Sequence, residues 1–252
     1  MMSLIAVAAA FFALLFGMPA FAPLVARAFP DVVPPIYGFA SFPAMLLSHA
    51  EIVAVAALAA VASALASGVF VTREAGRQFR PILGAVATIG QTFPPVAVLA
   101  IAVPALGYGE GPTFVALALS GFLPIVANVI AGIETVPQAV REAALGMGLS
   151  PLQVLVQVEL PLAAPVMLAG IRTAVAIMIG TATIGSTVGA VTLGTPIIDG
   201  LVGDKLPYVI EGASVVALFA ILVDLVLDRV ERGLGARTPR RAGAESKRDE
   251  FV

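Results

Sequence analysis

The chain has 252 residues, of which 60% are hydrophobic and only 12% are charged, and its mean hydropathy is +1.03. Water-soluble domains carry roughly a quarter charged residues, so this composition excludes an ordinary soluble fold. A formal net charge of -2 offers no basic surface for nucleic acid. The chain has no cysteine and one histidine, His49, which excludes disulfides, Cys-ligated zinc and a histidine metal cluster.

Apolar runs separated by charged residues, glycines and prolines predict an all-α, polytopic membrane protein. A bilayer core takes roughly 20 apolar residues per helix, so the chain holds about six spans and no sizeable soluble domain. The predicted spans are residues 4–26, 46–71, 82–106, 112–132, 164–191 and 206–227. Residues 229–252 form a polar tail that we predict to be disordered.

The first span ends near Ala20-Phe21-Ala22, which looks like a signal-peptidase site behind an apolar stretch. A signal peptide normally begins with a basic segment, however, and no Lys or Arg precedes this stretch. We therefore expect a retained helix that is bent by Pro19 and Pro23.

Lys and Arg are concentrated in alternate connections, and loops rich in these residues lie on the cytoplasmic side. Eleven of the fourteen basic residues lie in the second connection, the fourth connection or the tail, namely Arg73, Arg77, Arg80, Arg141, Arg229, Arg232, Arg237, Arg240, Arg241, Lys247 and Arg248. Only Arg27 and Lys205 lie in the opposite connections, and Arg172 lies inside the fifth span. We therefore predict a multi-pass membrane protein with both termini in the cytoplasm.

The fourth connection, residues 133–163, is longer than the others and predicts a compact helix-turn-helix. Thr135-Val136-Pro137-Gln138 is typical of a capping box, and Gly148 would stop the helix that it opens. The predicted apolar face of this helix consists of Val140, Ala143, Ala144 and Met147. Ser150-Pro151-Leu152-Gln153 is a second box, whose helix must end near Leu160, before Pro161.

Small residues on this unit permit the close approach of another protein, so we interpret it as a docking surface. These residues are Ala143, Ala144, Gly146 and Gly148. The alternative is an amphipathic helix that rests on lipid headgroups. That alternative expects several basic residues on the polar face, whereas only Arg141 is present.

At these residues the sequence resembles the membrane subunits of binding-protein-dependent ABC importers. The cytoplasmic loop of that family reads Glu-Ala-Ala, three residues, Gly, nine residues, Ile, one residue and Leu-Pro. The matching residues here are Glu142, Ala143, Ala144, Gly148, Val158, Leu160 and Pro161, with Val158 in place of Ile. The resemblance implies the fold of a type I ABC importer permease in the bacterial inner membrane, with this ATPase-coupling loop on the cytoplasmic side.

Four further segments resemble the osmoprotectant branch of the family, and the similarity covers roughly residues 49–228. The segments are residues 90–100, 158–165, 170–174 and 179–184. The resemblance implies import of glycine betaine, choline, carnitine or a related solute, and leaves an amino acid or a sulfonate as alternatives. We place the transmembrane domain at residues 46–228, after a first helix and exterior loop in 1–45.

A phosphate-binding loop requires Gly-Lys followed by Ser or Thr, but Lys205 follows Asp204 and Lys247 follows Ser246. We therefore expect a transport subunit that is not an enzyme and holds no cofactor. The resemblance implies three protein partners: a cytosolic ATPase that binds ATP and magnesium, an extracytoplasmic solute-binding protein, and a second permease that is identical or related. A bulky charge, as in Ala144→Glu, is expected to block docking of the ATPase.

Uncharged polar residues are the candidates for a translocation path. Gln91, Thr92, Pro94 and Pro95 interrupt the third span near its middle, where prolines leave backbone carbonyls that need a protein or water-lined environment. Thr181, Thr183, Ser186 and Thr187 supply hydroxyl groups to the fifth span. These hydroxyls serve equally well as contacts between packed helices.

The charged residues within or near the spans favour structural roles. We expect Arg172 to reach the cytoplasmic interface or to pair with an acid of the loop such as Glu159. His49 and Glu51 are expected at the outer interface, rather than in a proton relay. Asp224 and Asp228 are expected to be solvated or paired.

Tyr37, Tyr108 and Tyr208 lie in exterior connections, where a docked binding protein or ordinary interfacial anchoring explains them.

Two other classes of protein fit less well. An intramembrane enzyme needs a nucleophile with a base, or a metal site, and neither HExxH nor Gly-x-Ser-x-Gly occurs. An ion-coupled carrier typically has internal repeats and acids near the membrane midplane, and neither is evident.

Overall fold

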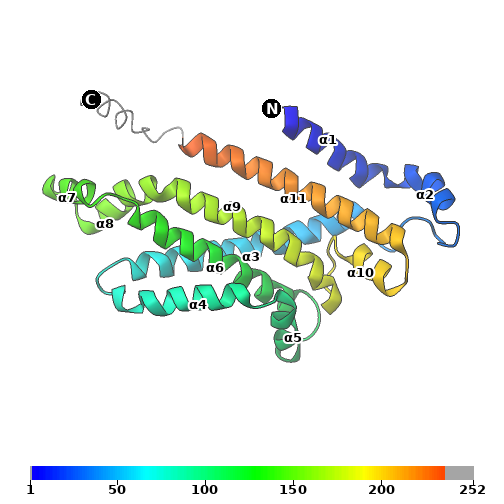
Figure 1. The fold of residues 1–252 in the computed structure, drawn as a ribbon, viewed down its shortest axis with the longest axis horizontal. Coiled ribbons are helices and arrows are strands. Elements are labelled where there is room, and N and C mark those ends of the chain that lie inside the picture. Colours follow the sequence, from blue (N-terminus) through cyan, green and yellow to red (C-terminus); the bar gives the residue numbers. More distant parts are fainter. Residues whose placement is uncertain (1, 236–252) are drawn as a thin grey trace, which may run out of the picture.

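The computed structural model describes residues 2–235, and this part of the chain is helical without a β-strand. Most of the long helices run along the length of the molecule, and short helices lie at its two ends (Figure 1). The longer helices are α1 (Met2–Gly17), α3 (Phe42–Val71), α4 (Arg80–Thr92), α5 (Pro95–Leu106), α6 (Glu110–Glu134), α9 (Leu160–Ile184) and α11 (Leu206–Gly235). The short helices are α2 (Ala22–Ala28), α7 (Gln138–Gly146), α8 (Pro151–Val154) and α10 (Thr195–Val202).

Five segments of the described chain are long and apolar enough to cross a bilayer, and a sixth crossing results if α4 and α5 count as one. The predicted interruption of the span 82–106 is confirmed, and α4 and α5 are bent by 98° relative to each other. Phe93 and Pro94 separate them in extended conformations. Proline has no N–H for the helix and disfavours helical geometry in the preceding residue, which explains the break.

The central core lies where α3, α6 and α9 pack together, and small residues bring these helices close. The buried residues of this core include Ala60, Ala64, Val126, Val129, Ala163 and Ala174. The tightest approach is between Gly170 of α9 and Asn128 of α6, because a Cβ at Gly170 would lie 2.4 Å from the Asn128 Cβ. The Asn128 side chain is itself held by a 2.8 Å hydrogen bond to the Pro124 carbonyl.

Gly170→Ala is therefore expected to separate α6 from α9 and lower the stability of the solubilised chain by about 1–3 kcal/mol, the usual cost of overpacking. Thermal unfolding in mild detergent measures this change. Gly180→Ala is the matched control, because it lies on the same helix and a Cβ there meets nothing within 4 Å. Equal stability of the two variants would contradict the close approach seen at Gly170.

The first predicted span is interrupted near Pro19 and Pro23, as expected. α1 ends at Gly17, a 3₁₀ turn covers Met18–Phe21, and α2 begins at Ala22. Pro19 and Pro23 lie in the first turns of the 3₁₀ turn and of α2. α1 runs alongside α11 (Figure 1), and Phe11 stacks on Phe219 with 5.9 Å between ring centroids.

Two predicted boundaries are wrong. The helix that begins at Pro151 does not stop before Pro161: α8, a π-helical turn (Leu155–Glu159) and α9 run on as one segment. Pro161 lies in the first turn of α9, where a missing N–H is tolerated. Residues 229–235, predicted as disordered, continue α11, and an Arg232–Asp228 ion pair one turn apart supports them. The rest of the predicted tail lies outside the described residues.

Candidate functional site

The predicted helix-turn-helix is present as α7 and α8, at one end of the molecule (Figure 1). The second capping box is confirmed: Ser150 Oγ accepts from the Gln153 N–H at 3.4 Å, and Gln153 Oε1 accepts from the Ser150 N–H at 2.8 Å. The first box is wrong. The Thr135 hydroxyl donates to the Gly132 carbonyl of α6 at 2.7 Å, so Pro137 precedes α7 without a side-chain cap.

Gly148 ends this first helix as predicted, and the structure gives the reason. Its φ is +89°, in the left-handed region that glycine adopts without steric cost. The Gly148 N–H donates to the Leu145 carbonyl at 2.9 Å, which closes the turn after α7. The chain then reverses into α8.

Most of the predicted apolar face of α7 is exposed, because only Ala144 among the residues of this helix is buried, at 2% exposure. Large apolar side chains of α7, α8 and the adjoining turns point outward instead. We call these residues the docking surface: Val140, Leu145, Met147, Leu152 and Val156. Met147 is the most exposed of them, at 75%. Large exposed apolar patches mark sites of interaction with another protein or with a membrane.

The loop residues that carry the family resemblance divide between surface and interior. Glu142, Ala143, Gly148 and Pro161 are exposed, and Val158 and Leu160 are half-buried. Ala144 faces inward, so it supports the helix rather than offering a contact to another protein. An Ala144→Glu variant would therefore disturb the packing of α7 in addition to any effect on docking.

The predicted pair between Arg172 and Glu159 is wrong, because each residue has other partners. Glu159 is 2% exposed and lies 2.7 Å from Arg73 and 2.8 Å from Arg141. Both arginines come from segments that precede it in the chain: Arg73 follows α3, and Arg141 belongs to α7. Sequence periodicity could not find these partners, since they depend on how the connections fold together.

Arg172 of α9 pairs instead with Asp224 and Asp228 of α11. This agrees with the prediction that these two acids are solvated or paired. Its guanidinium donates to the Asp224 carboxylate at 2.5 and 2.8 Å and to Asp228 at 2.8 Å. Glu231 lies 3.5 Å away. One arginine thus faces three carboxylates and joins two spanning helices.

Arg172→Gln is expected to loosen α11 from α9 and lower stability by about 1–3 kcal/mol, because three carboxylates lose their shared cation. The measurement is thermal unfolding of the purified chain in detergent. Arg80→Gln provides the control, since Arg80 pairs with Glu134 at 2.7 Å between two exposed side chains. A loss at Arg172 no larger than that at Arg80 would show that the cluster does not hold the two helices together.

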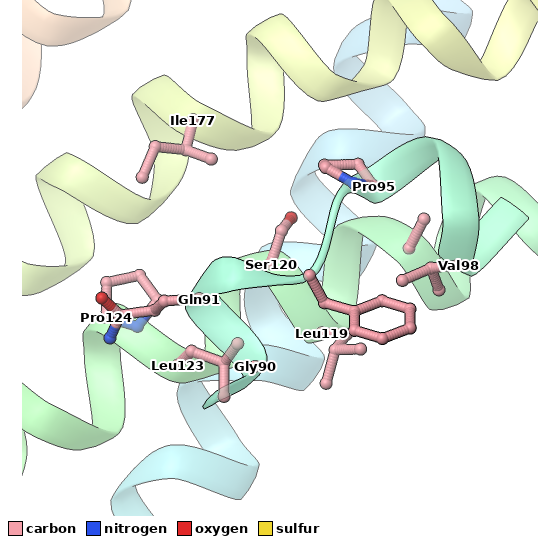
Figure 2. A pocket seen from close by; sticks show the side chains of 11 residues that line it. Gly90, Gln91, Pro95, Val98, Leu119, Ser120, Leu123, Pro124 and Ile177 are labelled. Atoms are coloured by element: carbon pink, nitrogen blue, oxygen red, sulfur yellow. The ribbon is translucent and has the colours of Figure 1, made fainter. Parts of the chain in front are cut away.

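The break between α4 and α5 borders a cavity of about 270 Å³. Gln91 and Pro95, two of the predicted path residues, line it, together with Ser120 and Pro124 of α6. Figure 2 shows Ile177 of α9 facing this region from another helix. The cavity wall is mainly apolar, with Gln91 and Ser120 as its polar side chains.

The other predicted path residues do not line this cavity. The hydroxyl groups of Thr92 and Thr183 donate to carbonyls of their own helices, at 2.7 and 2.6 Å, and Thr181 is buried. Sequence reasoning missed Ser120 and Ile177 because neither interrupts a span. A serine in α6 and an isoleucine in α9 carry no local signal that they face a break in α4.

The opposite end of the molecule is more tightly packed than predicted. His49 is fully buried rather than interfacial, and its Nδ1 accepts from the Leu193 N–H at 3.3 Å. Glu51, by contrast, is exposed. His49 is on α3 and Leu193 is in the connection before α10, so this bond closes the end of the helix bundle.

Of the three tyrosines that we predict in exterior connections, Tyr37 and Tyr208 are buried and structural, whereas Tyr108 is exposed. The Tyr37 hydroxyl donates to Asp199 at 2.9 Å, and the Tyr208 hydroxyl donates to the Pro34 carbonyl at 2.9 Å. Burial, followed by the hydrogen bond with Asp199, raises the pKa of the Tyr37 hydroxyl above its usual value. These contacts anchor the 29–41 connection to α10 and α11.

Together these features define a polytopic helical chain with a helix-turn-helix at one end and a broken helix beside a mainly apolar cavity. Residues 64–236 match the family described as binding-protein-dependent transport system inner membrane component. The chain belongs to this family. It is therefore an inner-membrane permease subunit of an ABC importer and not an enzyme, since the ATPase is a separate subunit in this family.

Curated relatives extend the similarity beyond the family model. The chain is 43% identical over 172 residues to the osmoprotectant import permease protein OsmY of Salmonella typhimurium, covering 68% of this chain and 73% of that protein. It is 41% identical over 186 residues to the choline transport system permease protein OpuBB of Bacillus subtilis, covering 74% and 85%.

A solved structure confirms the fold. The chain superposes on the inward-facing MetNI methionine ABC transporter with a TM-score of 0.67 at 21% identity, covering 75% of this chain and 94% of that one. At this identity the likeness concerns the fold alone. The predicted type I ABC importer permease fold is thereby confirmed.

Proposed function

We propose that the chain forms part of the membrane passage through which an ABC importer moves a small osmoprotectant, such as glycine betaine or choline. The observation that carries this proposal is the 43% identity to an osmoprotectant import permease, over most of both chains. Relatives named for choline transport and for carnitine transport match as well, at 41% and 33% identity. Alternating access driven by a separate ATPase supplies the movement.

The cavity at the broken helix supports this substrate class. Gln91 and Ser120 offer neutral polar groups between apolar walls, and no charged residue is among the lining residues. Such a surface suits a small zwitterion, because the two charges of the solute compensate each other and need no charged side chain in the wall. It does not by itself select one solute, and we assign selective capture to an extracytoplasmic solute-binding protein.

We assign the partners by position. A cytosolic ATPase, which holds ATP and magnesium, contacts the docking surface. The solute-binding protein contacts the opposite end, near α10 and the 29–41 connection. A second permease, either the same chain or a related one, completes the passage, because about six spans are few for a closed path.

This assignment requires both termini and α7 to be cytoplasmic. Because the chain has no cysteine, single-cysteine variants report the side directly. In intact cells an impermeant maleimide is expected to label Val33→Cys, in the exterior connection, and to leave the exposed Ala139→Cys of α7 unlabelled until the cells are lysed. The reverse pattern would invert the topology.

Competition for uptake tests the substrate. In proteoliposomes that hold the chain with its ATPase and binding protein, glycine betaine, choline and carnitine are expected to compete with labelled betaine or choline, and proline is not. If only an amino acid or a sulfonate competes, that compound class is the solute in place of an osmoprotectant. If the purified chain alone moves solute when an ion gradient is applied, the protein is a secondary carrier.

A further inference from the structure

One buried carboxylate connects the loop that carries the docking surface to the spanning helices. Carboxylates are almost never fully buried unless paired, and Glu159 has two partners, Arg73 at 2.7 Å and Arg141 at 2.8 Å. These arginines are themselves about one-third exposed, so the pairs lie at the boundary between the loop and the aqueous side. One side chain thus joins α7, the end of α3 and the start of α9.

α7 has few other attachments to the rest of the molecule. Ala144 is its one buried residue. Arg141 is the charged residue of α7 that reaches inward, where it donates to the Ile133 carbonyl at the end of α6 and pairs with Glu159. A helix held at so few points can move as a unit when a partner binds its outer face.

Glu159 also occupies the position from which such a movement can reach the membrane. It is the last residue of the π-helical turn Leu155–Glu159, immediately before α9. Single π-helical turns inside longer helices are frequently found at functional sites. α9 continues without a break to Arg172, which is joined to α11, and to Ile177, which lines the cavity.

We propose that Glu159 is a positioning residue that couples movement of α7 to α9, so that ATP hydrolysis on the partner is converted into transport. This inference rests on the proposed function. Because Glu159 is paired with Arg141, its carboxylate moves when α7 moves. The π-helical turn transmits this displacement to α9, and the pair with Arg73 keeps the end of α3 in contact with both helices.

The test is the number of solute molecules imported per ATP hydrolysed by the complete importer in proteoliposomes. Glu159→Gln keeps the shape of the side chain and removes its charge. We expect this variant to retain the ATPase and to hydrolyse ATP, while the ratio of solute to ATP falls about tenfold, a typical size for coupling between sites. Arg141→Gln is expected to lower the ratio in the same direction, because it removes the partner on α7.

Glu134→Gln is the matched control, since Glu134 pairs with Arg80 at the same end of the molecule but is exposed. Its ratio is expected to equal that of the unmodified chain. An unchanged ratio in Glu159→Gln, or an equal fall in Glu134→Gln, would overturn the proposal. If the Glu159→Gln chain does not assemble with the ATPase, the Arg141→Gln variant is the deciding test. An unchanged ratio of solute to ATP in that variant overturns the proposal. Absence of ATP-driven uptake by the unmodified importer would instead reject the proposed function.

Discussion

Met147→Glu is expected to abolish ATP-driven uptake by preventing the ATPase from binding to the loop. Met147 is 75% exposed and lies among the apolar side chains of the docking surface. A carboxylate placed in a buried protein interface loses its hydration without gaining a partner, and the loss of a central contact costs about 2–4 kcal/mol. We therefore expect the affinity for the ATPase to fall by at least about thirtyfold.

The affinity is measured by titrating the ATPase onto the detergent-solubilised chain. Met147→Leu is the control, because it preserves an apolar side chain of similar volume and should bind normally. Thermal unfolding of Met147→Glu should be unchanged, since an exposed side chain contributes little to packing. Normal affinity in Met147→Glu would show that the docking surface does not bind the ATPase.

Ser120→Trp is expected to reduce uptake at least about tenfold while leaving the bound ATPase in place. Ser120 lines the cavity beside the broken helix, whose volume is about 270 Å³. An indole ring occupies a large part of a space of that size and would narrow the passage between Gln91 and Ile177. Uptake and ATPase binding are measured on the same purified complex, which separates a blocked path from a lost partner.

Ser63→Trp controls for the effect of a large side chain on a spanning helix. The hydroxyl groups of Ser63 and Ser120 both donate to carbonyls of their own helices, at 2.7 and 2.9 Å, but Ser63 of α3 is exposed and does not line this cavity. Uptake by Ser63→Trp should be close to normal. If Ser120→Trp transports at the normal rate, the cavity is not on the path of the solute.

The fold was largely predictable because its strongest signal is local. Apolar runs long enough to span a bilayer located the helices, and Pro94-Pro95 predicted the break in the third span, which the structure confirms. The bend of 98° was not predictable, because its size depends on how α5 packs on α6 rather than on the prolines alone. Local pattern identifies an interruption but not the direction of the chain after it.

The helix-turn-helix in residues 133–163 shows the same limit within a short segment. The capping of α8 by Ser150 and Gln153 is predicted correctly, because the two side chains that form the box are close together in the sequence. The sequence pattern placed apolar residues on one face of α7 but did not indicate that most of this face is exposed. Periodicity predicts which residues share a face, but a docking face and a core face have the same pattern, and only the fold distinguishes them.

Charge pairing was the least predictable feature. The expected pair of Arg172 with Glu159 required the loop helix to end before Pro161, but the two residues lie on one continuous helical segment, Pro151–Val188, about 20 Å apart along its axis. Their partners instead come from other helices, Asp224 for Arg172 and Arg73 for Glu159. Such ion pairs depend on which helices are neighbours in the fold, and local sequence pattern does not reveal those neighbours.

The central claim is that this chain is the permease of an ABC importer and binds its ATPase through the docking surface. It is tested most directly by purifying the tagged chain from its native membranes in mild detergent, identifying the proteins that co-purify by mass spectrometry, and assaying ATP hydrolysis in the eluate. The account predicts a cytosolic ATPase in the eluate of the unmodified chain and its absence from that of Met147→Glu. A chain that purifies alone and without ATPase activity, under conditions that preserve known importers, would contradict it.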